Sequence, residues 1–317
     1  MSTFKELLQA SFKSNDTEEW LDVHFTRPIG LVFALLWNKL GIHPNAITIL
    51  SIFLGIGAGW MFYHTDLVYN IIGMILLMLA NFCDSTDGQM ARLTGKKTLT
   101  GRILDGFSSE LWFVAVYVAL CLRMQTQLIP GTEITWRYWI WILAALAGFL
   151  SHSQQAMLAD YYRQIHLFFL KGKHGSELDN SAQQEIKYKE TPHSQILARL
   201  FYKNYAAYCR KQEKRTPKFQ KFFAMWNNMD ASCSKEKLEE IRQKFLQGSK
   251  PMMPYANILS FNTRAIVLFM ACLLNIPWVY FLFEITLLNL LYIYMHKCHE
   301  TLCADMTAQL ANLQNND

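Results

Sequence analysis

The chain has 317 residues, of which 52% are hydrophobic and 17% are charged, and its formal net charge is +5. No positively charged segment followed by an A-x-A-like cleavage site opens the chain, so we expect no removable signal peptide. The seven cysteines form no C-x-x-C pair, which argues against a zinc site or a disulfide framework. Long apolar runs alternate with basic stretches, as is typical of a protein that crosses a membrane several times.

The segment from Trp20 to Asn45 precedes the first run that is long enough to cross a membrane. Its apolar patch Ile29–Leu36 is too short to span. We therefore expect an amphipathic helix along the membrane surface, with Trp20 and Trp37 at the depth of the headgroups. Asn45 can cap the helix that follows. Residues 1–46 are expected to form this N-terminal interfacial segment.

Six later stretches are apolar enough for helices that cross the bilayer, each of which needs about 20 residues. They are Ile47–Tyr63, Leu67–Cys83, Leu104–Leu122, Tyr138–Met157, Ile258–Leu274 and Pro277–Tyr294. Apart from Arg123 and Arg137, lysines and arginines fall in every second connection, so the positive-inside rule places both termini in the cytoplasm. The sequence predicts an all-α polytopic membrane protein, with four spans in residues 47–170 and two in residues 255–317.

Two glycines in the first span, Gly55 and Gly59, form a small-x-x-x-small pattern. Such a pattern lets a neighbouring helix approach closely. We expect these glycines to serve packing and not ligand binding.

Residues 171–254 form a polar and basic cytoplasmic insertion between the fourth and fifth spans. Apolar residues recur at helical spacing in "SQILARLFYKNYAAYCRK" and more weakly in "SKEKLEEIRQKFL", which predicts amphipathic helices on the membrane surface or against the core. Interleaved basic and aromatic residues are also found in nucleic-acid-binding proteins. Beside a membrane, contact with anionic lipid is the better interpretation, and a plain insertion remains an alternative.

Three aspartates, Asp84, Asp87 and Asp105, stand where the second span ends and the third begins. Carboxylates near the bilayer are costly and mark functional sites. Asp84 and Asp87 lie on one helical stripe. If the two spans form a hairpin, all three converge at the cytoplasmic surface, where hard oxygen ligands suit Mg²⁺ or Mn²⁺. Gly88 leaves room beside the backbone and Arg92 offers a guanidinium for phosphate, so the sequence indicates phosphoryl transfer at the lipid interface.

The pattern Asp84-x2-Asp87-Gly88-x2-Ala91-Arg92-x8-Gly101-x3-Asp105 resembles the signature of the CDP-alcohol phosphotransferase family. That family moves a phospho-lipid or phospho-alcohol group from a CDP-linked donor to an alcohol and releases CMP. The resemblance covers the N-terminal half and implies an enzyme of phospholipid biosynthesis.

The resemblance also implies a role for each matching residue. Asp84, Asp87 and Asp105 would bind two metal ions, Mg²⁺ or Mn²⁺, that hold the donor's pyrophosphate. The cytidine-nucleotide site would be lined by Gly88, Ala91, Arg92, Thr98 and Gly101, with Asn45 and Thr48 near the donor. The competing structural interpretation is that the aspartates are ordinary interface charges that pair with neighbouring basic residues.

The chain departs from the family at Ser109, where the pattern has a fourth aspartate that acts as general base. A serine needs an activating partner to serve as base. The next residue, Glu110, has suitable chemistry, but on a regular helix it points about 140° away from Asp105. A π-bulge would realign it, whereas a salt bridge would make it structural. A base from another helix, such as His152 or Asp160, is a third hypothesis.

An acceptor pocket is expected where the fourth span ends and the fifth begins. His152, Asp160, Arg163 and Arg264 are its candidate residues, and the arginines would suit a phosphorylated acceptor. Inositol phosphate or inositol is the first hypothesis for the acceptor, and CDP-diacylglycerol for the donor. CDP-choline- or CDP-ethanolamine-type transfer to a lipid alcohol stays open.

Two other classes are weighed against this enzyme. A divalent-cation transporter would place acids at mid-depth on several helices, whereas these acids gather at one surface. A non-catalytic relative that lost its base with the fourth aspartate is the other alternative. The expected partners are the donor, a small alcohol and membrane lipids, without nucleic acid, and a homodimer is left open.

Overall fold

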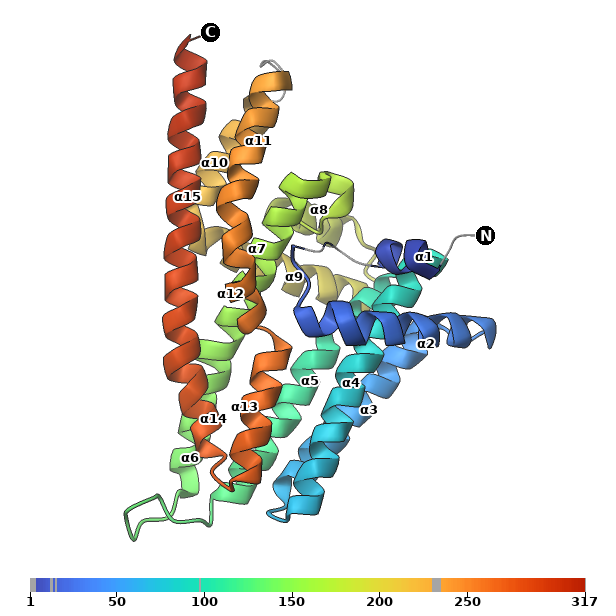
Figure 1. Ribbon diagram of the computed structural model, residues 1–317, viewed down its shortest axis with the longest axis vertical. Helices are drawn as coiled ribbons and strands as arrows, with labels where there is room; N and C mark the ends of the chain where they lie inside the picture. Colours follow the sequence, from blue (N-terminus) through green and yellow to red (C-terminus); the bar gives the residue numbers. More distant parts are fainter. Residues whose placement is uncertain (1–3, 12–13, 15, 97, 230–234, 317) are drawn as a thin grey trace. The chain divides into compact units, whose positions relative to one another are not determined.

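The computed structural model describes residues 4–11, 14, 16–96, 98–229 and 235–316, and in these ranges the elements are helices, with one isolated β-bridge between Leu128 and Thr135. The chain divides into two compact units. The first unit comprises residues 1–154 and 260–289, and the second comprises residues 155–259 and 290–317. Each unit is described by itself (Figure 1).

The helices of the first unit include three π-helical segments, labelled η. They are α1 (Phe4–Ser11), η1 (Asp22–Thr26), α2 (Arg27–Lys39), α3 (Pro44–Tyr63), α4 (Leu67–Thr94), α5 (Leu99–Met124), α6 (Arg137–Ala145), η2 (Leu146–His152), α13 (Phe261–Leu273), α14 (Trp278–Phe283) and η5 (Glu284–Leu288). Those of the second unit, including two 3₁₀ segments, are α7 (Ser153–Lys171), η3 (Lys173–Gly175), α8 (Ser181–Glu190), α9 (Ile196–Arg215), α10 (Pro217–Met229), α11 (Lys235–Ser249), η4 (Lys250–Met252), α12 (Met253–Ile258) and α15 (Asn289–Asn316).

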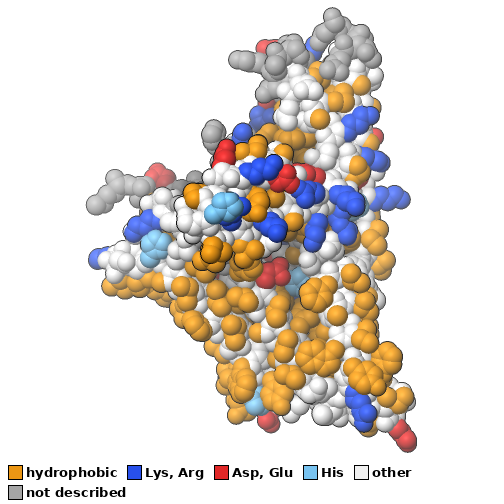
Figure 2. All heavy atoms as spheres, turned by 180° about the vertical axis from the view of Figure 1, so that it is seen from behind, with side chains coloured by type: hydrophobic (Ala, Val, Ile, Leu, Met, Phe, Trp, Pro, Cys, Tyr) orange, Lys and Arg blue, Asp and Glu red, His pale blue; other side chains and the backbone are white. Residues whose placement is uncertain are grey.

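Five helical stretches in the described residues are long and apolar enough to cross a membrane. They are Pro44–Tyr63, Leu67–Thr94, Leu99–Met124, Glu236–Leu273 and Trp278–Leu313. Hydrophobic side chains cover much of the surface that these helices present (Figure 2). The all-α membrane fold is therefore confirmed. The predicted fourth span, Tyr138–Met157, is helical but is not among the five, so the count of six stays a prediction.

The first unit is built around α3, which packs along both α4 and α5 (Figure 1). Gly55 and Gly59 make this close approach possible. A Cβ atom at Gly55 would overlap the indole of Trp112, and one at Gly59 would lie 2.8 Å from the carbonyl carbon of Ala115. The predicted packing role of the two glycines is confirmed.

The helix α2 lies crosswise to α4 (Figure 1) and packs against it. Its buried residues are Gly30, Leu31 and Ala34, whereas other large apolar side chains, among them Val32 and Leu36, are about half exposed. A helix with a packed inner face and an apolar outer face fits the predicted position along the membrane surface.

Arg123, one of the two exceptions to the charge pattern, is a buried structural residue. Its guanidinium donates to the carbonyl of Phe62 at 3.1 Å and to Asn70 Oδ1 at 2.8 Å, and also to the carbonyl of Cys272 and to Asn275 Oδ1 at 2.7 Å. It thus joins the ends of α3, α4 and α13 to α5. Because the charge is used inside the unit, it carries no topological signal.

The second unit has an aromatic core. The ring of Phe169 of α7 lies 5.6 Å from that of Phe222 of α10 and 4.2 Å from that of Phe245 of α11. The sequence left α11 either on the membrane surface or against the core. Ile241 and Phe245 are buried, so α11 packs against the core.

Candidate functional site

The three aspartates of the motif lie on α4 and α5 and come close together. Asp87 is buried, Asp84 is half-buried and Asp105 is exposed. Both Asp84 and Asp105 are near enough to Asp87 for their charges to act on it. The two helices thus bring the three aspartates into one region. Among the described residues, the group of three ligand atoms that lie within 4.8 Å of one another is a different one, on α15, so a metal site shared by the three aspartates stays a prediction.

Two hydroxyl groups orient these carboxylates. Thr48 of α3 donates a short hydrogen bond to Asp87 Oδ2. Ser108 Oγ lies 2.6 Å from Asp84 Oδ1 and 2.9 Å from the carbonyl oxygen of Asp105. Groups that hydrogen-bond to metal-binding carboxylates fix their orientation. The sequence placed Thr48 near the donor and missed Ser108, whose signal was its position three residues after Asp105, facing α4.

The residues predicted to line the nucleotide site gather at the first turns of α3 and α5. Thr98 caps α5, because its Oγ1 accepts a hydrogen bond from the Gly101 amide at 3.0 Å. A Cβ atom at Gly101 would lie 2.8 Å from Asn45 Oδ1. A larger residue at position 101 would therefore displace the Asn45 side chain from the start of α5.

Gly88 of α4 lies next to the guanidinium of Arg92. A Cβ atom at Gly88 would be 3.4 Å from a terminal nitrogen of Arg92, and the neighbouring Ala91 is half-buried. Arg92 thus lies on the α4 turn that carries Asp87. The nucleotide-binding roles of these residues stay predictions.

The helix α5 is α-helical at the fourth-aspartate position and throughout its length. The π-bulge that would realign Glu110 with Asp105 is therefore not there. Glu110 is exposed on this regular helix, while Ser109 is half-buried. The described π-helical segments of this unit lie elsewhere, at η1, η2 and η5. The assignment of Glu110 or Ser109 to catalysis stays a prediction, without the geometric support that a bulge would have given.

A buried carboxylate, Glu284, lies at the first position of η5 and is fully shielded from solvent. It pairs with Arg264 of α13 and accepts hydrogen bonds from Tyr117 and Tyr280. His152 Nδ1 lies 3.2 Å from its Oε1. The sequence did not single out Glu284, although a lone acid within an apolar span was a signal.

This network includes two of the predicted acceptor-binding residues, His152 and Arg264. His152 and Arg264 do come together, as the pocket hypothesis required. Arg264, however, is 1% exposed and pairs with Glu284, so its charge is already neutralised inside the unit. The structure therefore gives no support to Arg264 as a ligand for an acceptor phosphate.

The other two predicted acceptor residues belong to the second unit. Asp160 Oδ1 accepts a weak hydrogen bond from Gln164 at 3.4 Å, and Arg163 donates to the carbonyl of Ala256 at 2.9 Å. Their part in an acceptor pocket stays a prediction.

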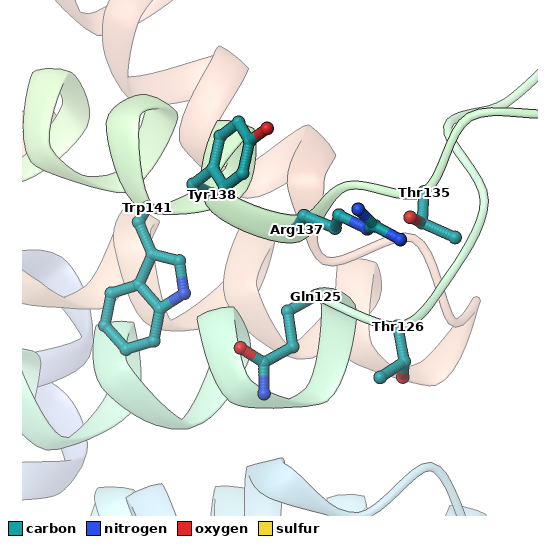
Figure 3. Close-up of a pocket in the computed structure, with 6 residues that line it drawn as sticks. All are labelled: Gln125, Thr126, Thr135, Arg137, Tyr138 and Trp141. Carbon is teal, nitrogen blue, oxygen red and sulfur yellow. The ribbon is translucent and has the colours of Figure 1, made fainter.

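A hollow of about 540 Å³ opens at the other end of α5 (Figure 3). Its lining residues are Gln125, Thr126, Thr135, Arg137, Tyr138 and Trp141. Gln125 follows the last residue of α5, whereas Asp105 lies near its first turn. No aspartate or glutamate is among these lining residues, so the hollow is separate from the aspartate cluster.

A second group of metal-ligand types occurs on α15 of the second unit. Ligand atoms of His299, Glu300 and Cys303 lie within 4.8 Å of one another and are buried. Glu300 accepts hydrogen bonds from the amides of Lys218 and Phe219, at the first turn of α10. A carboxylate at a helix N-terminus is stabilising in itself, so helix capping accounts for this acid.

Comparison with known proteins bears on the same part of the chain as the aspartates. Residues 41–171 match the model of the CDP-alcohol phosphatidyltransferase family. The matched residues make up less than half of the chain. They contain the aspartate cluster, the first turns of α3 and α5, and His152, whereas Glu284 and Arg264 lie outside them.

Two curated relatives share a shorter stretch with the chain. An archaetidylinositol phosphate synthase of Pyrococcus horikoshii is 34% identical over 84 residues, which are 26% of this chain and 43% of that protein. An uncharacterized protein of Aquifex aeolicus is 36% identical over 86 residues, 26% of this chain and 42% of that protein. The chain thus spans less than half the length of the curated relatives that it matches.

Proposed function

We propose that the protein is a metal-dependent membrane phosphotransferase of phospholipid biosynthesis. It would transfer a phosphatidyl group from CDP-diacylglycerol to an alcohol and release CMP. The convergence of Asp84, Asp87 and Asp105 in residues that match the CDP-alcohol phosphatidyltransferase family carries this proposal. In the bond change, the acceptor oxygen attacks the lipid-bearing phosphorus, the phosphoanhydride bond breaks towards CMP, and the acceptor loses its proton.

The three aspartates fit a divalent-metal site. They offer hard oxygen ligands. Water can reach Asp105 and Asp84, and the hydroxyls of Thr48 and Ser108 orient two of the carboxylates. We propose that they hold Mg²⁺ or Mn²⁺, as a pair of ions. A bound pair neutralises charge on the attacking and leaving oxygens.

The first turns of α3 and α5 would hold the cytidine nucleotide. Asn45, Thr98 and Gly101 lie together there, and a side chain at Gly101 would push against Asn45 Oδ1 and Thr98 Oγ1. Arg92, on the turn after Gly88, would bind the donor's phosphates. These residues would fix the pyrophosphate against the aspartates, so that positioning supplies much of the rate increase.

The acceptor is proposed to be inositol phosphate, with inositol as the second candidate. The matched archaetidylinositol phosphate synthase supports this class of head group. Because Arg264 is paired with Glu284, recognition of a phosphate would depend on other basic residues.

We propose that His152, and not Glu110, takes the acceptor proton. Its Nδ1 faces Glu284, while the side chain is 14% exposed. A carboxylate on one ring nitrogen fixes the tautomer and leaves the other nitrogen as a base. The imidazole also lies 4.4 Å from the ring of Phe113, one helical turn after Ser109. By contrast, Glu110 is exposed on a regular helix.

Sidedness follows from the charge pattern. We propose that both termini and the aspartate cluster face the cytoplasm, because lysines and arginines are concentrated in the connections on that side.

The deciding experiment is CMP release from CDP-diacylglycerol by the purified full chain. Inositol phosphate, inositol, glycerol phosphate and serine would each be supplied as acceptor, with Mg²⁺ or Mn²⁺. Release that depends on one acceptor identifies the substrate. Folded, metal-loaded protein without release with any acceptor would favour a non-catalytic relative that lacks the fourth aspartate.

A further inference from the structure

One face of α9, in the second unit, begins with exposed aliphatic side chains. Ile196, Leu197 and Leu200 are 73%, 77% and 52% exposed. A single exposed leucine needs no explanation, but these three side chains are neighbours on the first turns of one helix. A grouped apolar exposure of this kind marks an interaction site.

The same face continues with lysines. Counted from Ile196, positions i+4, i+7, i+15 and i+18 share one side of a helix, and they are Leu200, Lys203, Lys211 and Lys214. The three lysines are exposed. The opposite side of α9, with Ala198, Ala206 and Cys209, is buried in the unit. The inward face of α9 is therefore packed, and the outward face is aliphatic at its start and basic along its length.

Acidic groups are kept off this face. Glu213, the single acid of α9, turns to the start of α8, where it accepts hydrogen bonds from the amide and the hydroxyl of Ser181, both at 2.6 Å. Glu185 of α8 pairs with Arg210.

The connection between α8 and α9 is held in place, so the aliphatic residues are presented by a fixed element. Arg199 donates to the carbonyls of Tyr188 at 3.3 Å and Thr191 at 2.7 Å. Its guanidinium lies 4.5 Å from the centre of the Tyr188 ring. The exposure of Ile196 and Leu197 therefore accompanies an ordered turn.

We propose that this face of α9 docks on the surface of an anionic phospholipid bilayer. The aliphatic start of the helix would insert between the headgroups, and the lysines would lie against lipid phosphates. Interfacial helices have this combination of aliphatic and basic residues, and each lysine near an anionic surface contributes about a fivefold factor to binding. In an anionic bilayer the apolar acyl chains lie directly below the negatively charged headgroups, which matches the aliphatic and basic parts of this face.

The chain tethers this segment to the bilayer. Residues 171–254 connect the end of the matched stretch to α13, which belongs to a stretch apolar enough to span. The docking proposal does not depend on transfer activity, because it concerns residues outside the matched stretch.

Hydrogen–deuterium exchange of the full chain in nanodiscs tests the proposal. Single copies would be placed in phosphatidylcholine discs and in discs that also contain phosphatidylglycerol. We expect the backbone amides of residues 196–203 to exchange at least about tenfold more slowly in the anionic discs than in the phosphatidylcholine discs, because several lysines act together. High salt should remove most of the difference, since it screens exposed charges.

Matched variants assign the effect to this face. The triple variant Lys203→Gln/Lys211→Gln/Lys214→Gln should lose the lipid-dependent protection, as should Leu197→Ser/Leu200→Ser. The control Lys218→Gln/Lys221→Gln/Lys244→Gln changes the same charge on exposed residues of α10 and α11 and should keep it. Equal exchange in both lipids would overturn the proposal. If slow exchange appears only in nanodiscs that hold two copies of the chain, the face binds a second copy and not lipid, and the docking proposal is wrong.

Discussion

The aspartate cluster of α4 and α5 and the carboxylate of Glu284 are two acidic sites in one unit, and they differ in their access to water. Asp105 is exposed and Asp84 half-buried, whereas Glu284 is completely buried. A sealed charge must be neutralised by the protein, and Arg264 does so. An accessible cluster can take its counter-charge from solution, as a metal site must.

This difference in access predicts opposite behaviour under mutation. Changes in the open cluster should remove activity and leave the fold. Changes in the sealed network should weaken the fold first. The predictions below separate the two sites, beginning with the largest expected effect.

Asp84→Asn, Asp87→Asn and Asp105→Asn should each reduce CMP release to background, because each removes a charged metal ligand. Thermal unfolding of the Asp84→Asn and Asp105→Asn variants should stay close to that of the wild type, since these two side chains are not sealed in the core. Transfer at a near wild-type rate in any of the three would refute the metal assignment.

His152→Asn should lower kcat by about 10²–10⁴-fold, the usual contribution of a general base. Asparagine can still donate to Glu284 but lacks the second ring nitrogen, so the fold should persist. The groups around this site are Glu284, Tyr117, Tyr280 and Arg264.

Glu110→Gln is the matched comparison for His152→Asn. It should have little effect, because Glu110 is exposed on a regular helix. If Glu110→Gln instead lowers kcat by this factor and His152→Asn does not, Glu110 is the general base. Ser109→Asp would then test whether the family's aspartate restores activity.

Arg264→Ala should destabilise the protein by about 3–5 kcal/mol, because it leaves the buried Glu284 without its main counter-charge. A lowered unfolding temperature measures this effect. Arg264→Met with Glu284→Leu removes both charges and should recover much of the stability. A stable Arg264→Ala variant with a raised acceptor KM would instead restore Arg264 as an acceptor-binding residue.

Ser108→Ala should lower metal affinity by about 10–100-fold, as is typical when a group that orients a metal ligand is lost. The measurement is the Mg²⁺ or Mn²⁺ concentration for half-maximal CMP release. Ser109→Ala is the control, since Ser108 and not Ser109 contacts Asp84. Equal shifts in both variants would contradict the orienting role of Ser108.

Much of the candidate site was predictable because it depends on local helix geometry. Asp84 and Asp87 are three residues apart, and a helix of 3.6 residues per turn places them on one side. The short connection from Thr94 to Leu99 then brings α5 back towards α4. The close approaches at Gly55 and Gly59 were likewise visible as a spacing.

The errors arose where a side chain's surroundings come from distant parts of the chain. Glu110 could take the place of the family's aspartate only through a π-bulge, and α5 is regular there. Arg123 was rightly set apart from the charge pattern, but its partners Asn70 and Asn275 could not be read from the sequence. Arg264 was assigned to a phosphate, but its partner is Glu284, twenty residues further on.

The sequence by itself determined the membrane class, the helices and the spacing of the aspartates, because helix periodicity and the cost of charge in lipid act locally. The tertiary structure decided which polar groups are sealed and which stay open. Glu284 receives partners from α5, η2, α13 and α14, whose residues are far apart in the chain. Such contacts depend on how whole helices pack, and side-chain packing across helices is not encoded in any one segment.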